Sequence, residues 1–465
     1  MASGLEQLPD DILLNIIAYV EVHPSPTLKD LRRLSRRFSV LVTPHLFSSF
    51  TSGAGSNSFI SLRRCHAMIS DISAHKTTVF KHTRSLRINM DQSSFTDDDM
   101  VLWTNLWTTF VVIMHSLTSF ILDVYPETID NARTARINNV IRIISSHRTL
   151  KDFALIICGG HPLPELSLQP LSGLHAFSLS WDLREHLNSN LTAEVSSLLG
   201  RCPNLERVSV GMIARHNMHW VLNPQPLDAL IESWSLLKDP LKLRKLAIRG
   251  VTISSEDLIS NIRHLRNLKD LAIESYHTLV DLGKIFDILR KEDIHLRNIS
   301  ITALHPPEII EYISSFNGLE RFFIESYDTR DDAPSLIHNL FSALQRHCAT
   351  LSSLAIHIDR ISSWQETSRK HIAENVGLFQ VLEELDIHVH VSAEDVQLKN
   401  AEPLLAWLEI ATRFPALRTI KIRPVRKGPG IEPSLRRISW DFRWQTVQDF
   451  RRKREFTFDI ILHKY

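Results

Sequence analysis

The chain has 465 residues, of which 43% are hydrophobic and 23% are charged, as in an ordinary folded protein. Its formal net charge of +1 excludes a polyelectrolyte, and its 14 glycines argue against a fold built on several glycine-rich phosphate loops. Acidic side chains interrupt the N-terminal apolar run, so we expect no signal peptide. The cysteines lie far apart without a CxxC pair, which predicts reduced thiols and a cytoplasmic or nuclear protein: Cys65, Cys158, Cys202 and Cys348.

The first fifty residues predict a small helical unit, which we place at residues 4–50. Apolar residues recur at helical spacing from Leu8 to Val20, and Pro9 suits a first turn. Thr27 with Asp30 resembles a capping box that opens a second helix. We expect that helix to continue to Pro44 and a short third element to begin at His45. The apolar stripe of the second helix is Leu28, Leu31, Leu34, Phe38 and Leu41.

A linker and a connecting helix are expected at residues 51–79. The segment TSGAGSNS from Thr51 is small and polar, and its GxG lacks a third glycine and a preceding strand, which excludes a dinucleotide-binding loop. The stretch from Met100 to Leu122 has no acidic residue, lysine or arginine, but its Thr, Asn, Ser and His side chains are too polar for a membrane span. We predict a buried helix followed by a strand there.

A short phrase, apolar-x-x-apolar-x-apolar, recurs twelve times from about residue 80. Alternation over the phrase predicts a half-buried strand, and helical stretches such as those starting at Ser254 and Pro306 lie between phrases. Each strand–helix unit is too small to bury its apolar face alone, so neighbours must stack around one core. The sequence therefore predicts an α/β solenoid of parallel strands at residues 80–445, followed by a C-terminal cap or tail at 446–465. The central apolar residues are Leu86, Phe120, Phe153, Phe177, Val208, Leu246, Leu271, Ile299, Phe322, Leu354, Leu385 and Ile420, with Ile438 as a weak thirteenth.

Two stretches together carry a family resemblance. LEQLPDDILLNIIAYV followed by LKDLRRLSRRFSVLVTPHLF resembles an F-box, and the phrases resemble leucine-rich repeats. In F-box/leucine-rich-repeat proteins the F-box docks on the Skp adaptor of a cullin–RING ubiquitin ligase, and the repeats hold the substrate. The loop at Glu21–Pro26 is longer than usual, and the Asn/Cys ladder of regular repeats is missing, so we expect an irregular solenoid.

The resemblance implies a docking surface for the Skp adaptor on the N-terminal unit. Its three helices bury little by themselves, so a partner's groove would stabilise apolar residues that remain uncovered. Alternatively, about half of these residues hold the three helices together. The candidates are Leu8, Pro9, Ile12, Leu13, Ile16, Leu34 and Phe38.

The strands predict a second surface, because alternation turns the neighbours of the central residues outward, onto a concave face. The phrase IESY occurs at Ile273 and again at Ile324, two strands apart. Charged and aromatic residues on a broad face suit protein recognition, although a solvated face without a partner is the alternative. The outward candidates are Arg249, Glu274, Tyr276, Glu325, Tyr327, His357, Asp359, Asp386, His388, His390, Lys421 and Arg423.

Other chemistry receives less support from the sequence. His388 and His390, with His357 and Asp359 on the preceding strand, could bind zinc, but this spacing is common by chance and we predict no metal or cofactor. No GxSxG, HExxH or GxxxxGK[ST] motif is present.

The segment from Arg418 to Arg454 is basic, with twelve Lys or Arg against three Asp or Glu. It could be a nuclear-import signal or contact nucleic acid through its Trp and Phe residues, but we expect it to cap the open end of the repeat core.

We therefore predict a non-enzymatic substrate receptor of an SCF-type ubiquitin ligase, with the Skp adaptor, a cullin and an unidentified protein substrate as partners. No membrane or nucleic acid partner is expected. The alternative is a repeat scaffold whose F-box acts outside ubiquitin transfer.

Overall fold

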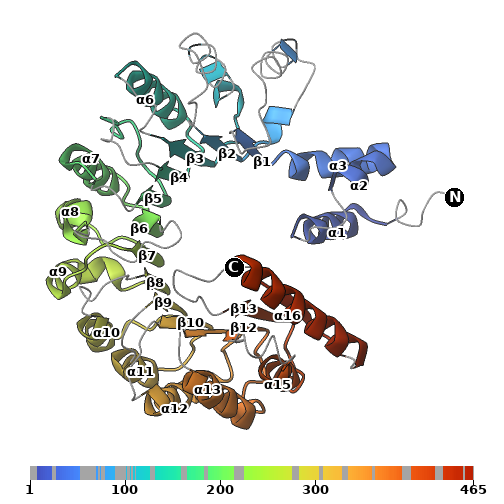
Figure 1. Ribbon diagram of the computed structural model, residues 1–465. Coiled ribbons are helices and arrows are strands. Elements are labelled where there is room, and N and C mark those ends of the chain that lie inside the picture. Colours follow the sequence, from blue (N-terminus) through green and yellow to red (C-terminus); the bar gives the residue numbers. More distant parts are fainter. Residues whose placement is uncertain are drawn as a thin grey trace. The chain divides into compact units, whose positions relative to one another are not determined.

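The structure is a computed structural model of a mixed α/β protein whose strands pair in parallel. The chain folds as two compact units: the first comprises Met1–Ile213 with Ala229–Pro240, and the second comprises Ala214–Asp228 with Leu241–Tyr465. Figure 1 shows the elements by label. The structure describes residues 8–22, 28–52, 70–71, 74, 79–89, 101, 105, 108–109, 111–125, 131–158, 165–182, 187–213, 225–274, 282–302, 307–326, 333–358, 362–389, 400–424, 433–453 and 456–463.

The N-terminal segment forms helices α1 (Asp10–Val22), α2 (Leu28–Leu34) and α3 (Arg36–Leu46). The prediction of one helix from Thr27 to Pro44 is wrong, because Ser35 adopts an extended conformation between α2 and α3. Its hydroxyl accepts a hydrogen bond from the Phe38 backbone N–H at 3.3 Å and so caps α3. Pro44 lies in the last turn of α3, and His45 belongs to the same helix.

In the first unit, strands follow one another in chain order and pair in parallel. The predicted central residues occupy one register line, in which Leu86 pairs with Phe120, Phe120 with Phe153, Phe153 with Phe177, and Phe177 with Val208. A strand that the sequence did not predict, β1, joins this sheet directly after α3 and pairs with β2. The strands are β1 (Ser49–Ser52), β2 (Ser85–Asn89), β3 (Ser119–Val124), β4 (Asp152–Ile157), β5 (Ala176–Asp182) and β6 (Arg207–Ile213).

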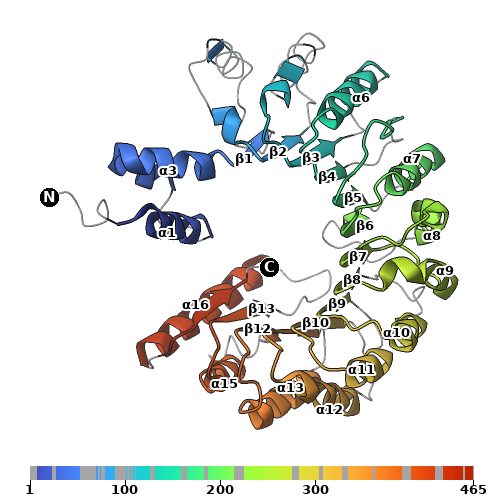
Figure 2. The same ribbon diagram turned by 180° about the vertical axis from the view of Figure 1, so that it is seen from behind.

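The core of this unit contains a ladder of phenylalanine rings. Phe153 stacks between Phe120 and Phe177 with ring centroids 6.1 and 6.4 Å apart, and all three side chains are buried. Helices α6 (Asn131–Ser145) and α7 (Ser189–Gly200) lie on one side of the strands (Figures 1 and 2). The ladder results from placing one aromatic residue at the same register position of three parallel strands.

The second unit continues the pattern in its own strands. Leu246, Leu271, Ile299, Phe322, Leu354, Leu385 and Ile420 again form one register line. The strands are β7 (Lys245–Arg249), β8 (Asp270–Glu274), β9 (Asn298–Thr302), β10 (Arg321–Ser326), β11 (Ser353–Ile358), β12 (Glu384–Val389), β13 (Thr419–Pro424) and β14 (Asp459–Leu462).

The C-terminal end corrects one prediction. Ile438 is not in a strand but in the long helix α16 (Pro433–Lys453), which contacts α15 (Glu402–Ala411). The strand that follows β13 is β14, and its Ile460 pairs with Ile420. The helix α16 therefore crosses residue 445, where we placed the end of the repeats.

Helices alternate with the strands of the second unit, as expected. Ser254 caps α9 in a capping box with Asp257, and α11 begins at Pro307. Helices α9 to α12 lie on one side of their strands in both views (Figures 1 and 2). Besides α16, these helices in chain order are α9 (Ser255–Leu265), α10 (Leu282–Lys291), α11 (Pro307–Ser314), α12 (Ala333–Leu344), α13 (Ser362–Asn375) and α15 (Glu402–Ala411). A further helix, α8 (Leu227–Ile231), carries Leu227 and Asp228 of the second unit and residues 229–231 of the first.

Buried polar side chains bond the turns that precede the strands. Within the described ranges, backbone N–H groups just before a strand donate to a side chain of the following helix or turn in four places: Leu174 to Cys202 Sγ, Leu241 to His264 Nδ1, Leu296 to Tyr312 Oη and Leu319 to His347 Nδ1. These bonds satisfy backbone N–H groups that would otherwise be buried without a partner.

Tyr312 gives a test of these bonds. Its hydroxyl donates to the Ile294 carbonyl at 2.6 Å and accepts from the Leu296 N–H at 3.1 Å. Because Tyr312→Phe leaves both buried groups without that partner, we expect a loss of about 1–3 kcal/mol in unfolding free energy. Urea unfolding at neutral pH measures it.

The same residue predicts an alkaline limit. Burial raises the pKa of the Tyr312 phenol above its ordinary value of 10, against the hydrogen bond from Leu296. The phenol has a higher pKa in the folded state than in the unfolded state. The stabilisation by its two hydrogen bonds is therefore complete below about pH 10 and is lost as the pH rises further. Wild-type stability should fall more steeply above pH 10 than that of Tyr312→Phe, and equal slopes would contradict the assignment.

None of the helices in the described part of the chain combines the length and the apolar character that crossing a membrane requires.

Candidate functional site

The seven docking candidates on α1 to α3 divide by exposure. Leu13 and Phe38 are 0% and 1% exposed and form a small core with Ile17 and Val42. Leu8 and Ile16 are partly buried against that core. By contrast, Pro9 is exposed, and Ile12 and Leu34 are 41% and 58% exposed. Leu13 and Phe38 therefore hold the helices together, and Pro9, Ile12 and Leu34 are the candidates that a partner can reach in this structure.

Arg37, which we did not single out from the sequence, fixes the start of α1. Its Nη2 donates to the Leu8 carbonyl at 2.7 Å, and its Nε donates to the Asp10 carboxylate at 3.0 Å. These bonds join α3 to the residues at the start of α1, so Pro9, just before the helix, and Ile12, in its first turn, are exposed on a helix end that is held in place.

The strand face of the second unit carries the other candidates. Arg249 pairs in register with Glu274, Glu274 with Thr302, and Thr302 with Glu325, which places the two IESY glutamates two strands apart as predicted. Arg249 Nε forms an ion pair with Glu274 at 2.9 Å. Four candidates lie outside the described residues: Tyr276, Tyr327, Asp359 and His390.

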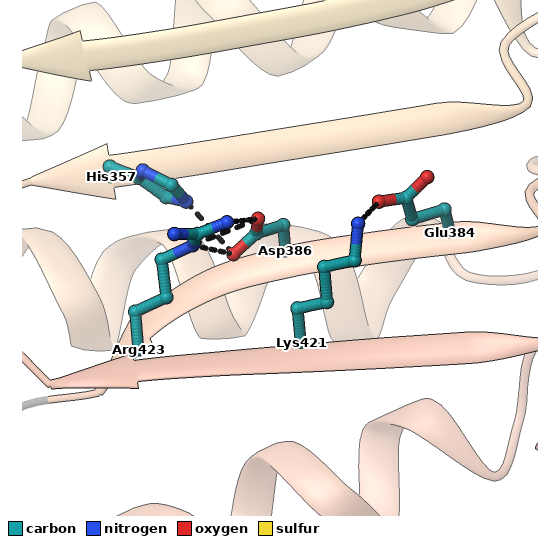
Figure 3. A network of polar contacts seen from close by, with 5 residues as sticks. All are labelled: His357, Glu384, Asp386, Lys421 and Arg423. Atoms are coloured by element: carbon teal, nitrogen blue, oxygen red, sulfur yellow. Dashed lines mark hydrogen bonds and ion pairs between the residues drawn. The ribbon is translucent and has the colours of Figure 1, made fainter. Parts of the chain in front are cut away.

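A polar cluster lies farther along this face, on strands β10 to β13, and we define it as Glu325, His357, Asp386, His388 and Arg423. Asp386 accepts from His357 Nε2 at 2.9 Å and from two nitrogens of Arg423 at 2.9–3.0 Å (Figure 3). The rings of His357 and His388 are stacked, with centroids 4.1 Å apart.

The sequence predicts an outward face open to a protein partner for these residues, but three members of the cluster are almost completely buried. His357, Asp386 and His388 are only 3%, 5% and 7% exposed. Strand alternation places them opposite the apolar line of Leu385 and Ile387, but stacked and ion-paired neighbours from adjacent strands cover them. A buried carboxylate is tolerated because its charge is paired and hydrogen-bonded.

The electrostatics of Asp386 follow from these contacts. Burial alone would raise the pKa of its carboxyl, but the hydrogen bonds from His357 and Arg423 outweigh burial and lower the pKa to about 2. Nearby, burial and then the charge of Arg423 lower the pKa of His463, which follows β14. Asp386 is therefore ionised at neutral pH.

A second ion pair on the same two strands is more open. Lys421 Nζ contacts the Glu384 carboxylate (Figure 3). Both side chains are between a quarter and a third exposed. In the register, Glu384 precedes Asp386 by two residues and Lys421 precedes Arg423 by two. This pair provides a matched comparison for the buried one.

The basic C-terminal segment lies largely on α16. The rings of Trp440 and Trp444 stack with centroids 6.4 Å apart, and Trp444 is 46% exposed. In the last turn, Arg451, Arg452 and Lys453 are exposed, whereas Arg454 lies outside the described residues. Val447 and Phe450 are buried, so one face of the helix contributes to the core.

Comparison with models of protein families gives no match to this chain, and comparison with curated proteins gives none either.

Proposed function

We propose that this protein is a substrate-recognition subunit of an SCF-type ubiquitin ligase. In this proposal α1 to α3 dock on the Skp adaptor, the strand faces bind a protein substrate, and the chain itself supplies no catalytic group. Holding a target near a separately recruited conjugating enzyme raises its effective concentration, which is sufficient for transfer.

The observation that carries the proposal is the exposure of Ile12 and Leu34. Both are large apolar residues within the F-box-like sequence, and both remain exposed although Leu13, next to Ile12, and Phe38, four residues after Leu34, are buried. Burying one such side chain in a partner's groove contributes roughly 1.5–3 kcal/mol. Exposed apolar residues on a small helical unit with its own core support a docking role.

The test is binding of the full chain to a purified Skp adaptor. We expect Ile12→Asp with Leu34→Asp to weaken binding by at least about 10-fold, because each change places a charge where apolar burial is needed. The matched control is Leu236→Asp with Ile259→Asp, which changes two exposed apolar residues elsewhere, 84% and 57% exposed. Equal affinity of the docking variant and the wild type would refute the docking surface.

A second measurement distinguishes a ligase subunit from a repeat scaffold. A ligase subunit should bring the cullin with the Skp adaptor and support ubiquitin transfer to a co-purified protein. A scaffold would bind the adaptor without cullin-dependent transfer.

A further inference from the structure

Three side chains of the polar cluster come together from adjacent strands. Glu325 on β10 pairs in register with His357 on β11, and His357 stacks on His388 of β12. One potential ligand atom from each of the three lies within 4.8 Å of the others. The outer two strands should be about 9.6 Å apart, so Glu325 and His388 must both lean toward the central His357.

The hydrogen bond of His357 determines which of its nitrogens can bind an ion. A carboxylate only accepts hydrogen bonds, so the proton of the bond to Asp386 is on Nε2 of His357. In the neutral ring, Nδ1 then carries the in-plane lone pair. Histidine ligands of metals commonly donate their other N–H to a carboxylate, and this contact orients the ring and raises its basicity. Asp386 is in turn held by Arg423.

We propose that Glu325, His357 and His388 bind one divalent transition metal ion of the zinc type. Two imidazoles and one carboxylate form a donor set that Zn²⁺ uses where a fourth position stays open to water or to an incoming ligand. Both histidines are more than nine-tenths buried, and Glu325 is half-buried, so an ion enters along the side of Glu325. This site is independent of the docking surface on α1 to α3.

The ring geometry implies a movement on binding. The planes of His357 and His388 differ by 7°, and the lone pairs lie in these planes, so one ion cannot lie in both while the rings stay stacked. His357 keeps its place because Asp386 bonds it and Phe323 packs edge-on against it at 4.8 Å. The ring of His388 therefore turns out of the stack when the metal binds.

The experiment is titration of the full-length protein with Zn²⁺ alone by calorimetry, and with Co²⁺ followed by its visible absorption. We expect one equivalent to bind with tetrahedral Co²⁺ bands. Glu325→Gln and His388→Ala should each weaken this binding at least 10-fold. Glu325→Gln is the safer variant, because its side chain is half-buried and its hydrogen bond from Thr302 is long at 3.5 Å.

The matched control is His295→Ala. His295 pairs with Asp293 at 3.0 Å outside the polar cluster, and its side chain is 46% exposed. The His295→Ala variant should therefore still bind one equivalent of metal ion. Circular dichroism of each metal-free variant verifies its fold. The proposal would be overturned if the wild type bound no metal ion. It would also be overturned if Glu325→Gln and His388→Ala bound the metal ion as tightly as the wild type and the His295→Ala control.

Discussion

Replacing Phe153 with alanine is expected to lower the free energy of unfolding of the strands around β4 by about 3–5 kcal/mol, because it removes a fully buried ring and leaves a cavity. Phe153 is the middle of three stacked rings, so both Phe120 and Phe177 lose a neighbour. In a repeat array each unit is stabilised mainly by its neighbours, so the loss should be greatest in β3 to β5. Hydrogen exchange of these strands, together with urea unfolding, measures it.

The control is Ile156→Ala on the same strand. Ile156 lies on the opposite face of β4 from Phe153 and is half-buried. Its truncation removes less buried surface, and we expect a loss of about 1 kcal/mol. If both changes cost the same, or if exchange accelerates equally in strands far from β4, the ladder does not hold these repeats together.

The repeat strands could be predicted from the sequence because alternation reports burial directly. From Leu86 to Val208 and from Leu246 to Ile420, the central residue of each phrase is the residue that pairs in register. The signal failed where a phrase was weak. Ile438 matched it in a segment that is helical, and the short strand β14 escaped because it follows that helix without a full phrase.

Helix boundaries were harder because one stripe can run through two helices. The apolar residues from Leu28 to Leu41 keep helical spacing across Ser35, so the break depends on a local bond of the Ser35 hydroxyl that spacing does not reveal. The available signal was the serine itself, because serine is a favourable N-cap residue.

The candidate site could be predicted only in part. Alternation indicates the face on which His357, Asp386 and His388 lie, but it does not indicate how far neighbours cover them. The covering contacts join residues 29 and 37 positions apart, between His357 and Asp386 and between Arg423 and Asp386. Likewise, the sequence does not indicate that Glu325 lies beside His357, because this depends on the register between β10 and β11.

Replacing Asp386 with alanine is expected to destabilise the second unit by about 3 kcal/mol, because it leaves His357 and Arg423 without their common partner in a buried place. The side chain of His357 is 4% exposed, whereas that of Arg423 is 35% exposed and can be solvated by water in the variant. The expected loss of unfolding free energy therefore lies at the lower end of the range for broken buried ion pairs. Asp386→Asn keeps the volume and one acceptor, so it should cost less than alanine. Urea unfolding and hydrogen exchange of β11 to β13 give both values.

Glu384→Ala separates burial from charge as the cause of this loss. It removes the carboxylate of the ion pair with Lys421 on the same two strands, where both partners are more than a quarter exposed. Water solvates a lysine left alone there, so the expected cost is about 0–1 kcal/mol. A large loss for Asp386→Ala beside a small one for Glu384→Ala would show that the polar cluster stabilises these strands because it is buried. Similar losses for the two variants would instead mean that any charge pair on this face serves equally, and that the burial of Asp386 has no special structural effect.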